Sequence, residues 1–243
     1  MSKTTHNPEN FGDSRVDLRG VKIYPFTDAD SLIDFADERK GILVAVNALK
    51  IANANDLTRS IINNNIGYCD GAGAVLAARQ KGASPVKIAG CELWLKIIER
   101  FHTERSFYII GATPKVNEAT VAKLREMYPA IKLVGHRDGY IRTPEDRAAL
   151  IADVAAKKPD FVFVAMGSPT QELLMADMLK AHRAVYQGLG GSFDVFTGTV
   201  KRAPKWWLDH NLEFAYRLLK QPSRITRNYK YIPFGWWLLT KQF

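Results

Sequence analysis

The chain has 243 residues, 47% hydrophobic and 24% charged, which is ordinary for a soluble globular protein of one large or two small domains. Lysine and arginine outnumber aspartate and glutamate by 34 to 25, so we expect an anionic partner: a nucleic acid, a phosphorylated small molecule or an acidic membrane. The two cysteines exclude a disulfide framework, and no apolar run suits a signal peptide or a membrane-spanning helix of roughly 18 residues. A reduced, cytosolic setting is the simplest expectation.

Strands, glycine-containing turns and helices alternate along most of the chain. We expect a frayed, polar tail up to about residue 17. After it the patterns predict, in chain order, a strand at 21–24, a helix at 28–39, a strand at 41–46, a helix at 48–65, a strand at 66–69, a helix at 74–81, a marginal strand at 86–89, a helix at 92–102, a strand at 106–110, a helix at 115–127, a strand at 131–134, a helix at 144–158, a strand at 161–166, a helix from 171 and a strand at 184–188. This alternation is typical of βαβ units, so we predict an α/β fold with a doubly wound, mainly parallel, Rossmann-like sheet.

One stretch, FVFVAMGSPTQE at 161–172, is the centre of this arrangement. Its apolar first half suits a strand that is buried on both faces of a parallel sheet. Gly167 and Ser168 then form a turn, Pro169 suits the first turn of a helix, and Gln171 opens that helix. The free N–H groups of a helix start attract phosphate, so this stretch is either a phosphate-binding loop or an ordinary connection.

Polar side chains follow most of the predicted strands. They are Asn47, Asp70, Thr113, Tyr140, Gln171 and Asp194. Parallel strands bring their carboxyl ends to one edge of the sheet, where we expect a ligand to bind. None of these loops is a Walker A or GxGxxG sequence, so the familiar nucleotide-binding fingerprints are absent.

After about residue 201 the chain becomes basic and rich in Trp and Tyr. We predict a helix at 213–220 and another from Arg224, which would place Arg224 and Arg227 on one helix face. The chain closes on WWLL at 236–239. Basic residues mixed with Trp and Leu are typical of a segment that lies on an anionic bilayer. The alternative is a helical pair packed on the sheet with a solvated basic face.

Several blocks of the chain resemble the WecG/TagA/CpsF glycosyltransferase family. They are VAVNALK at 44–50, YCDGAGAV at 68–75, VKIAGCELW at 86–94, GHRDGY at 135–140, VAMGSPTQE at 164–172, GGSFDVFTGTVKRAPKWW at 190–207 and LEFAYRLLKQPSR at 212–224. The resemblance covers nearly the whole chain from about residue 40 and is closest to the WecG branch.

The resemblance implies an inverting transfer of an N-acetylmannosamine-type sugar, or its uronic acid, from a UDP donor. The acceptor would be N-acetylglucosamine on undecaprenyl diphosphate, in the synthesis of bacterial surface polysaccharide. Other members transfer glucuronic acid or glucose. The family is not known to need a metal, so we expect no metal site and no cofactor.

The same resemblance assigns roles to residues at the strand ends. Asp70 matches the proposed catalytic base, with glycines beside it that leave room for substrate; its alternative is an Asx-turn or a helix N-cap. Gln171 matches a glutamine beside the donor sugar and diphosphate, in the same loop as Gly167 and Ser168. Asn47 lies next to the strand of Asp70 and could position the acceptor or the base.

Two further positions match residues near the nucleoside, where Asp194 can bind ribose hydroxyls and Tyr140 can stack on uracil; each also has an ordinary structural alternative. The basic residues that match acceptor or diphosphate contacts are Lys87, Arg217, Arg224 and Arg227. Arginine forks can neutralise the charge that develops on a departing diphosphate. A solvated basic face is the alternative.

The sequence departs from many family members at three places. Ala45 stands where a hydroxyl residue is common, Lys87 where arginine is common, and Cys69 where a small alanine precedes Asp70. These differences bear on the donor contacts more than on the reaction class.

We therefore expect a peripheral enzyme on the cytoplasmic face of the bacterial inner membrane. Residues 1–17 would be a flexible tail, 18–200 the α/β UDP-sugar-binding domain and 201–243 a helical appendage that binds membrane and acceptor. The net charge also suits a nucleic-acid-binding protein, but the basic residues gather near an apolar terminus, so we expect no nucleic acid. A third alternative is a protein that binds UDP-sugars without catalysing transfer. The presence of both Asp70 and Gln171 argues against this alternative. Self-association stays open.

Overall fold

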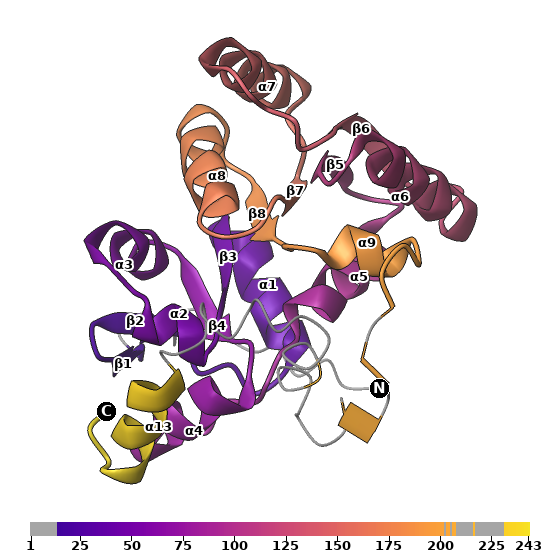
Figure 1. The fold of residues 1–243 in the computed structure, drawn as a ribbon. Coiled ribbons are helices and arrows are strands. Elements are labelled where there is room, and N and C mark those ends of the chain that lie inside the picture. Colours follow the sequence, from indigo (N-terminus) through magenta and orange to yellow (C-terminus); the bar gives the residue numbers. More distant parts are fainter. Residues whose placement is uncertain (1–13, 202, 205, 208–215, 217–230) are drawn as a thin grey trace. The chain divides into compact units, whose positions relative to one another are not determined.

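The computed structural model describes residues 14–201, 203–204, 206–207, 216 and 231–243 (Figure 1). Six strands form one parallel sheet in the order β4-β3-β8-β7-β5-β6, flanked by helices, and two short strands form an antiparallel pair, β1-β2. The predicted α/β class with a parallel sheet is confirmed.

The chain divides into two compact units. Unit 1 comprises Met1–Phe35, Ala45–Ala89 and Arg202–Phe243, and unit 2 comprises Ala36–Val44 and Gly90–Lys201. The described elements of unit 1 are β1 (Val16–Leu18), β2 (Val21–Ile23), α2 (Ala48–Ala52), α3 (Asp56–Asn63), β4 (Ile66–Cys69), α4 (Ala72–Gln80) and α13 (Tyr231–Leu239). Those of unit 2 are α5 (Gly90–Phe101), β5 (Ser106–Gly111), α6 (Pro114–Met127), β6 (Lys132–Arg137), α7 (Pro144–Lys157), β7 (Phe161–Ala165), α8 (Thr170–Ala181), β8 (Val185–Gly188) and α9 (Ser192–Phe196). The division passes through α1 (Ala29–Arg39) and β3 (Gly41–Val46).

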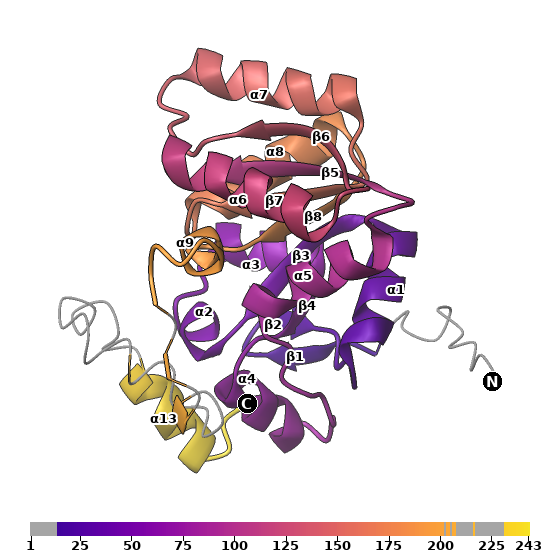
Figure 2. The same ribbon diagram turned by 90° about the vertical axis from the view of Figure 1, so that its right-hand side faces the viewer.

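In unit 2, helices cover both faces of the strands. Helices α7 and α8 lie on one face, while α5, α6 and α9 lie on the other (Figures 1 and 2). Every residue of β7 is buried, as its apolar sequence predicts. Trp94 of α5 packs against the ring of Phe163 at a centroid distance of 5.7 Å. Tyr108 of β5 points to the opposite face, where its hydroxyl donates a hydrogen bond to Asp153 of α7. Burial of each large side chain contributes about 1.5–3 kcal/mol, so this two-sided packing is the main stabilisation of the unit.

In unit 1, α3 is tied to the β1-β2 pair through one side chain. The Asn63 carboxamide accepts a hydrogen bond from the Lys22 N–H at 2.8 Å and donates one to the Gly20 carbonyl at 2.9 Å. Helix α13 packs beside α2 and α4 (Figure 1), and its Phe234 side chain is only 3% exposed. A Cβ atom at Gly73 would lie 3.1 Å from the Phe234 ring and 3.0 Å from the Ala48 Cβ, so a glycine is needed for this packing.

The structure corrects the predicted helix at 48–65, which is two helices. The chain leaves α2 after Ala52, and Asn55 caps α3: its side chain accepts from the Thr58 N–H at 2.9 Å while the Thr58 hydroxyl oxygen accepts from the Asn55 N–H at 3.0 Å. The sequence NAND at 53–56 favours such a break, because asparagine competes with the helical backbone and prefers cap positions.

Other elements also differ from the prediction, among them β6, which ends at Arg137 and not at residue 134. Residues 86–89 form no strand, although the Val86 and Ile88 N–H groups bond to neighbouring carbonyls. Helix α9 occupies a stretch predicted as loop, and β1 begins at Val16, inside the predicted tail. The helices predicted at 213–220 and from Arg224 lie outside the described residues.

Candidate functional site

In unit 1, the ends of β3 and β4 bring Asn47 and Asp70 onto adjacent strand ends. The Asp70 N–H donates to the Val46 carbonyl at 2.8 Å. The Asn47 Oδ1 caps α2 by accepting from the Lys50 N–H at 3.0 Å, and its Nδ2 makes no hydrogen bond within the described part of the chain. Asp70 is partly exposed and precedes Gly71, which is the N-cap of α4, so Asp70 is not the helix N-cap that its sequence allows.

Lys87 belongs to the same neighbourhood of unit 1. The extended segment at 86–88 runs beside the end of β4, where the Ile88 N–H donates to the Cys69 carbonyl at 2.9 Å. Lys87 precedes Ile88 and is exposed. The structure therefore places the backbones of three predicted site residues, Asn47, Asp70 and Lys87, around one pair of strand ends.

The glycines after Asp70 differ in purpose from each other. Among the described residues other than its chain neighbours, the Asn47 Cβ is the one atom within 4 Å of a Cβ placed at Gly71, at 3.6 Å, so these residues leave room at Gly71 beside Asp70 and Asn47. Gly73 instead makes room for Phe234 and Ala48, and the expectation that both glycines admit a substrate is wrong for Gly73.

The Cys69 thiol is unreactive, although Cys69 precedes the proposed base Asp70. Burial, with the negative charge of Asp70 as a second cause, raises the pKa of the Cys69 thiol to about 12. At about pH 8 such a thiol is therefore almost entirely protonated and unreactive. We expect iodoacetamide to modify the partly exposed Cys91 and to spare Cys69 until the protein is unfolded, as measured by mass spectrometry of its peptides. Equal modification of both cysteines in the folded protein would contradict the burial of Cys69.

In unit 2, the Gln171 side chain joins two loops. Its Oε1 accepts from the Gly167 N–H at 3.1 Å, in the loop between β7 and α8, and from the Gly190 N–H at 2.9 Å, in the loop after β8. Gln171 is only 6% exposed, and a Cβ at Gly188 would lie 2.3 Å from its Nε2. In this arrangement the amide oxygen is committed to holding the loops.

Glu172 is a residue that sequence reasoning missed. It is 5% exposed, and its Oε1 accepts from the Gln171 Nε2 at 3.4 Å. A glutamate in the first turn of a helix is usually solvated. Hydrophobic periodicity identifies buried positions by their apolar residues, so it could not identify Glu172 as buried. Its position inside the block VAMGSPTQE is the one feature that could have pointed to it.

The loop that Gln171 holds turns sharply between β7 and α8. Gly167 adopts a φ of +80°, which favours glycine, and the Ser168–Pro169 peptide bond is cis. Ser168 is exposed, and Pro169 is the N-cap of α8 with no side-chain cap bond to the first turn. The first N–H groups of α8 thus lack a cap from that residue, as a phosphate-binding helix start requires.

Asp194 lies in the first turn of α9, and α9 packs on α6 rather than continuing from the end of β8. The Lys123 Nζ of α6 donates to the Phe196 carbonyl at 2.6 Å and lies 4.6 Å from the centre of the Phe196 ring. Figure 2 shows α9 beside α6. This packing carries Asp194 toward the side of unit 2 on which β5 and β6 lie.

Tyr140 follows β6 and is 47% exposed. Its N–H donates to the Asp138 Oδ1 at 2.8 Å, and the Gly139 N–H donates to the Ala112 carbonyl at 2.8 Å, so this loop lies against the loop before α6. The Arg142 guanidinium lies 5.0 Å from the centre of the Tyr140 ring. Asp194 and Tyr140 therefore lie toward α6 from two different strands, and the exposed ring is accessible to a stacking partner.

Arg217, Arg224 and Arg227 lie outside the described residues. Among the side chains that the structure describes, no group of three or more His, Cys, Asp or Glu residues could hold a metal ion. Nor does that part of the chain contain a helix with the length and hydropathy to cross a bilayer.

Comparison with protein-family models gives one match of nearly full length. The model of the glycosyl transferase WecG/TagA/CpsF family matches residues 16–243. The matched region includes every residue of both strand-end neighbourhoods described above, and its start coincides with the first residue of β1.

Proposed function

Because the chain belongs to the WecG/TagA/CpsF family and is a glycosyltransferase, we propose that it transfers an N-acetylmannosamine-type sugar, or the corresponding uronic acid, from UDP to a lipid-linked acceptor. The proposed acceptor is N-acetylglucosamine on undecaprenyl diphosphate, and the proposed transfer inverts the anomeric carbon without a metal. A donor carrying glucuronic acid or glucose, with another lipid-linked acceptor, is the alternative. The observation that carries the proposal is a strand-end carboxylate, Asp70, within a family match that covers residues 16–243.

Asp70 is the proposed general base. Inverting transfer requires a group that removes the proton of the acceptor hydroxyl as that oxygen attacks the anomeric carbon. Asp70 precedes the cap of α4, and Gly71 beside it leaves open space. The Asn47 Nδ2 has no other hydrogen bond among the described residues, so it can donate to the acceptor or to the Asp70 carboxylate. Lys87, exposed beside the same strand ends, would supply positive charge for the acceptor phosphates.

The donor would bind to unit 2. The Ser168 N–H and the start of α8 would present backbone N–H groups to the diphosphate, and Gln171, whose Oε1 accepts from the Gly167 N–H, would fix the turn for this purpose. Asp194 would accept hydrogen bonds from the ribose hydroxyls, and Tyr140 would stack on the uracil. The negative charge that develops on the departing UDP would be neutralised by Arg217, Arg224 and Arg227. With these arginines in that role, the transfer would need no metal ion.

A membrane-bound acceptor requires the enzyme to reach a bilayer. Helix α13 exposes large apolar side chains: Ile232 is 77% exposed, Trp236 62% and Leu239 83%. Apolar and aromatic residues of this kind favour the bilayer interface over nucleic acid. We therefore propose peripheral association with the cytoplasmic face of the membrane, with α13 at the interface.

The experiment is a screen of UDP-sugars with a prenyl-diphosphate-linked N-acetylglucosamine acceptor, performed in excess EDTA. We expect one UDP-sugar to yield a lipid-linked disaccharide and an equal amount of UDP, with no loss of rate relative to a reaction without chelator. UDP release that does not depend on the acceptor would indicate hydrolysis. A strict requirement for Mg²⁺ would transfer the leaving-group role from the arginines to an ion.

A further inference from the structure

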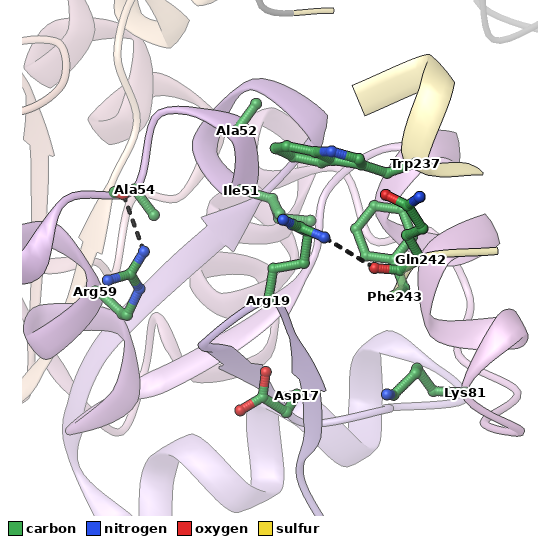
Figure 3. Close-up of a pocket in the computed structure, with 10 residues that line it drawn as sticks. All are labelled: Asp17, Arg19, Ile51, Ala52, Ala54, Arg59, Lys81, Trp237, Gln242 and Phe243. Atoms are coloured by element: carbon green, nitrogen blue, oxygen red, sulfur yellow. Dashed lines mark hydrogen bonds between the residues drawn. The ribbon is translucent and has the colours of Figure 1, made fainter. Parts of the chain in front are cut away.

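Unit 1 contains a cavity of about 580 Å³ that the proposed transfer reaction does not use (Figure 3). It is lined by the turn of the β1-β2 pair, by α2 and α3, by the end of α4, and by α13 with the residues that follow it. The charged side chains in its wall are Asp17, Arg19, Arg59 and Lys81. Three cations against one carboxylate make the cavity attractive to an anion.

The carboxylate and one of the cations are partly engaged by neighbours. The Asp17 Oδ1 accepts from the Gly20 N–H at 2.6 Å, which closes the turn between β1 and β2. The Arg59 Nη1 lies 3.1 Å from an oxygen of Asp56, whose side chain is fully exposed, so water and salt weaken that ion pair. The Arg59 Nε is buried and has no hydrogen-bond partner in the described structure. The Arg59 Nη2 also donates to the Ala54 carbonyl at 3.2 Å, so Arg59 offers a ligand chiefly its positive charge.

The second arginine is held in place by the C-terminal residues. The Arg19 guanidinium lies 4.1 Å from the centre of the Trp237 ring, and its Nη1 donates to the Gln242 carbonyl at 3.0 Å. Phe243 and Trp237 add apolar surface to the wall. A cation stacked on an aromatic ring and beside apolar side chains suits a ligand with an anionic group and a hydrocarbon part.

The third cation, Lys81, follows the last turn of α4. It is exposed, and its side chain makes no hydrogen bond or ion pair with any described residue. Figure 3 shows its side chain directed toward the cavity from the side opposite Arg59. Its ammonium group is thus available to a phosphate.

We infer that this cavity binds the phosphate headgroup of an anionic phospholipid at the membrane surface. Trp237, in the cavity wall, lies on α13 next to the exposed Trp236, so the cavity adjoins the helix that we propose to contact the bilayer. A lipid that enters from that surface would place its phosphate among Arg19, Arg59 and Lys81 and its glycerol and upper chain along Trp237. The inference rests on the membrane association in the proposed function, and it adds a lipid-headgroup site separate from the acceptor site.

The test compares two charge-removing substitutions near the end of α4. Lys81→Gln removes a cavity cation, and Arg79→Gln removes an exposed cation in the last turn of the same helix that does not line the cavity. Binding is measured by co-sedimentation with phosphatidylcholine vesicles that contain phosphatidylglycerol. We expect Arg79→Gln to weaken binding by at most about fivefold, the contribution of one charge near an anionic surface, and Lys81→Gln to weaken it by about tenfold or more. Equal effects of the two substitutions would contradict the inference.

A second measurement does not depend on vesicles and identifies the ligand. The indole N–H signal of Trp237 is followed by NMR while short-chain phosphatidylglycerol, short-chain phosphatidylcholine or inorganic phosphate is added. We expect a saturable shift with phosphatidylglycerol, which Arg59→Gln abolishes, and weaker or no shifts with the other two. An equal response to inorganic phosphate would assign the site to a free anion and overturn the lipid assignment.

Transfer by the unsubstituted protein is assayed in parallel, so that the two proposals can fail separately. Cavity-dependent vesicle binding without any transfer would support the lipid site and contradict the proposed function. Transfer without a difference between Lys81→Gln and Arg79→Gln would contradict the lipid site alone.

Discussion

Replacement of Asp70 by asparagine is expected to lower the rate of transfer by about 10²–10⁴-fold, the usual contribution of a general base. Asparagine keeps the size of the side chain and can still accept a hydrogen bond, but it cannot remove a proton at neutral pH. The backbone bond from the Asp70 N–H to the Val46 carbonyl does not involve the side chain, so the end of β4 should keep its structure. We expect UDP binding, measured by calorimetry, to stay close to that of the parent.

The matched control is the neighbouring residue. Cys69→Ala removes a buried thiol that the proposed reaction does not use. We expect a loss of about 1 kcal/mol in the free energy of unfolding, since a small buried group is removed, with the transfer rate nearly unchanged. If Asp70→Asn turned over within a few-fold of the parent, Asp70 would be a turn-forming residue and another base would be required.

Replacement of Gln171 by alanine is expected to lower both stability and donor binding. The Gly167 and Gly190 N–H groups would lose their shared acceptor. Both donors are only partly buried, so water can replace part of what is lost; at about 0.5–1.5 kcal/mol for each hydrogen bond, the free energy of unfolding should fall by about 1–3 kcal/mol in denaturant titration. The Gly167–Ser168 turn would lose its fixed geometry, and the KM for the UDP-sugar should rise.

Two further variants separate the positioning role of Gln171 from direct contact with the donor. Gly188→Ala leaves Gln171 in the chain but adds a Cβ that would lie 2.3 Å from the Gln171 Nε2, so it should displace the side chain and raise KM in the same way. Gln171→Glu keeps an oxygen that accepts both N–H groups, but its second oxygen would face the buried Glu172 carboxylate. It should therefore restore part of the stability that alanine loses only at acidic pH, where one of the two carboxyl groups is protonated. If Gln171→Ala were as stable as the parent and yet failed to bind donor, Gln171 would contact the donor directly.

The elements that local sequence determines were predictable. Strand β3, Gly41–Val46, coincides with the predicted strand because a short, unbroken apolar run rich in Ile, Leu and Val favours a strand buried on both faces. The single helix predicted at 48–65 was wrong because it was inferred from hydrophobic periodicity alone. Periodicity does not register the capping box of Asn55 and Thr58, which begins a second helix. Helix α9 is short, and its packing on α6 is a tertiary contact that local pattern does not contain.

The sequence predicted which residues belong to the candidate site better than it predicted how their side chains are arranged in space. Strand ends indicated Asn47 and Asp70, and the structure places them on neighbouring strands. The bonds of the Gln171 side chain to two separate loops depend on the pairing of β7 with β8, which the sequence does not specify. The cavity of unit 1 could not be predicted, because Arg19, Arg59 and Lys81 come from segments that form no motif together.

The central claim is that this glycosyltransferase moves a sugar from UDP to a lipid-linked acceptor with inversion. The most direct test is the anomeric configuration of the disaccharide formed in the UDP-sugar screen, read from the one-bond carbon–proton coupling at the new glycosidic carbon by NMR. From an α-linked UDP-sugar we predict a β-linked product that requires the prenyl-diphosphate acceptor and is absent with Asp70→Asn. An α-linked product, or free sugar as the sole product, would contradict the account.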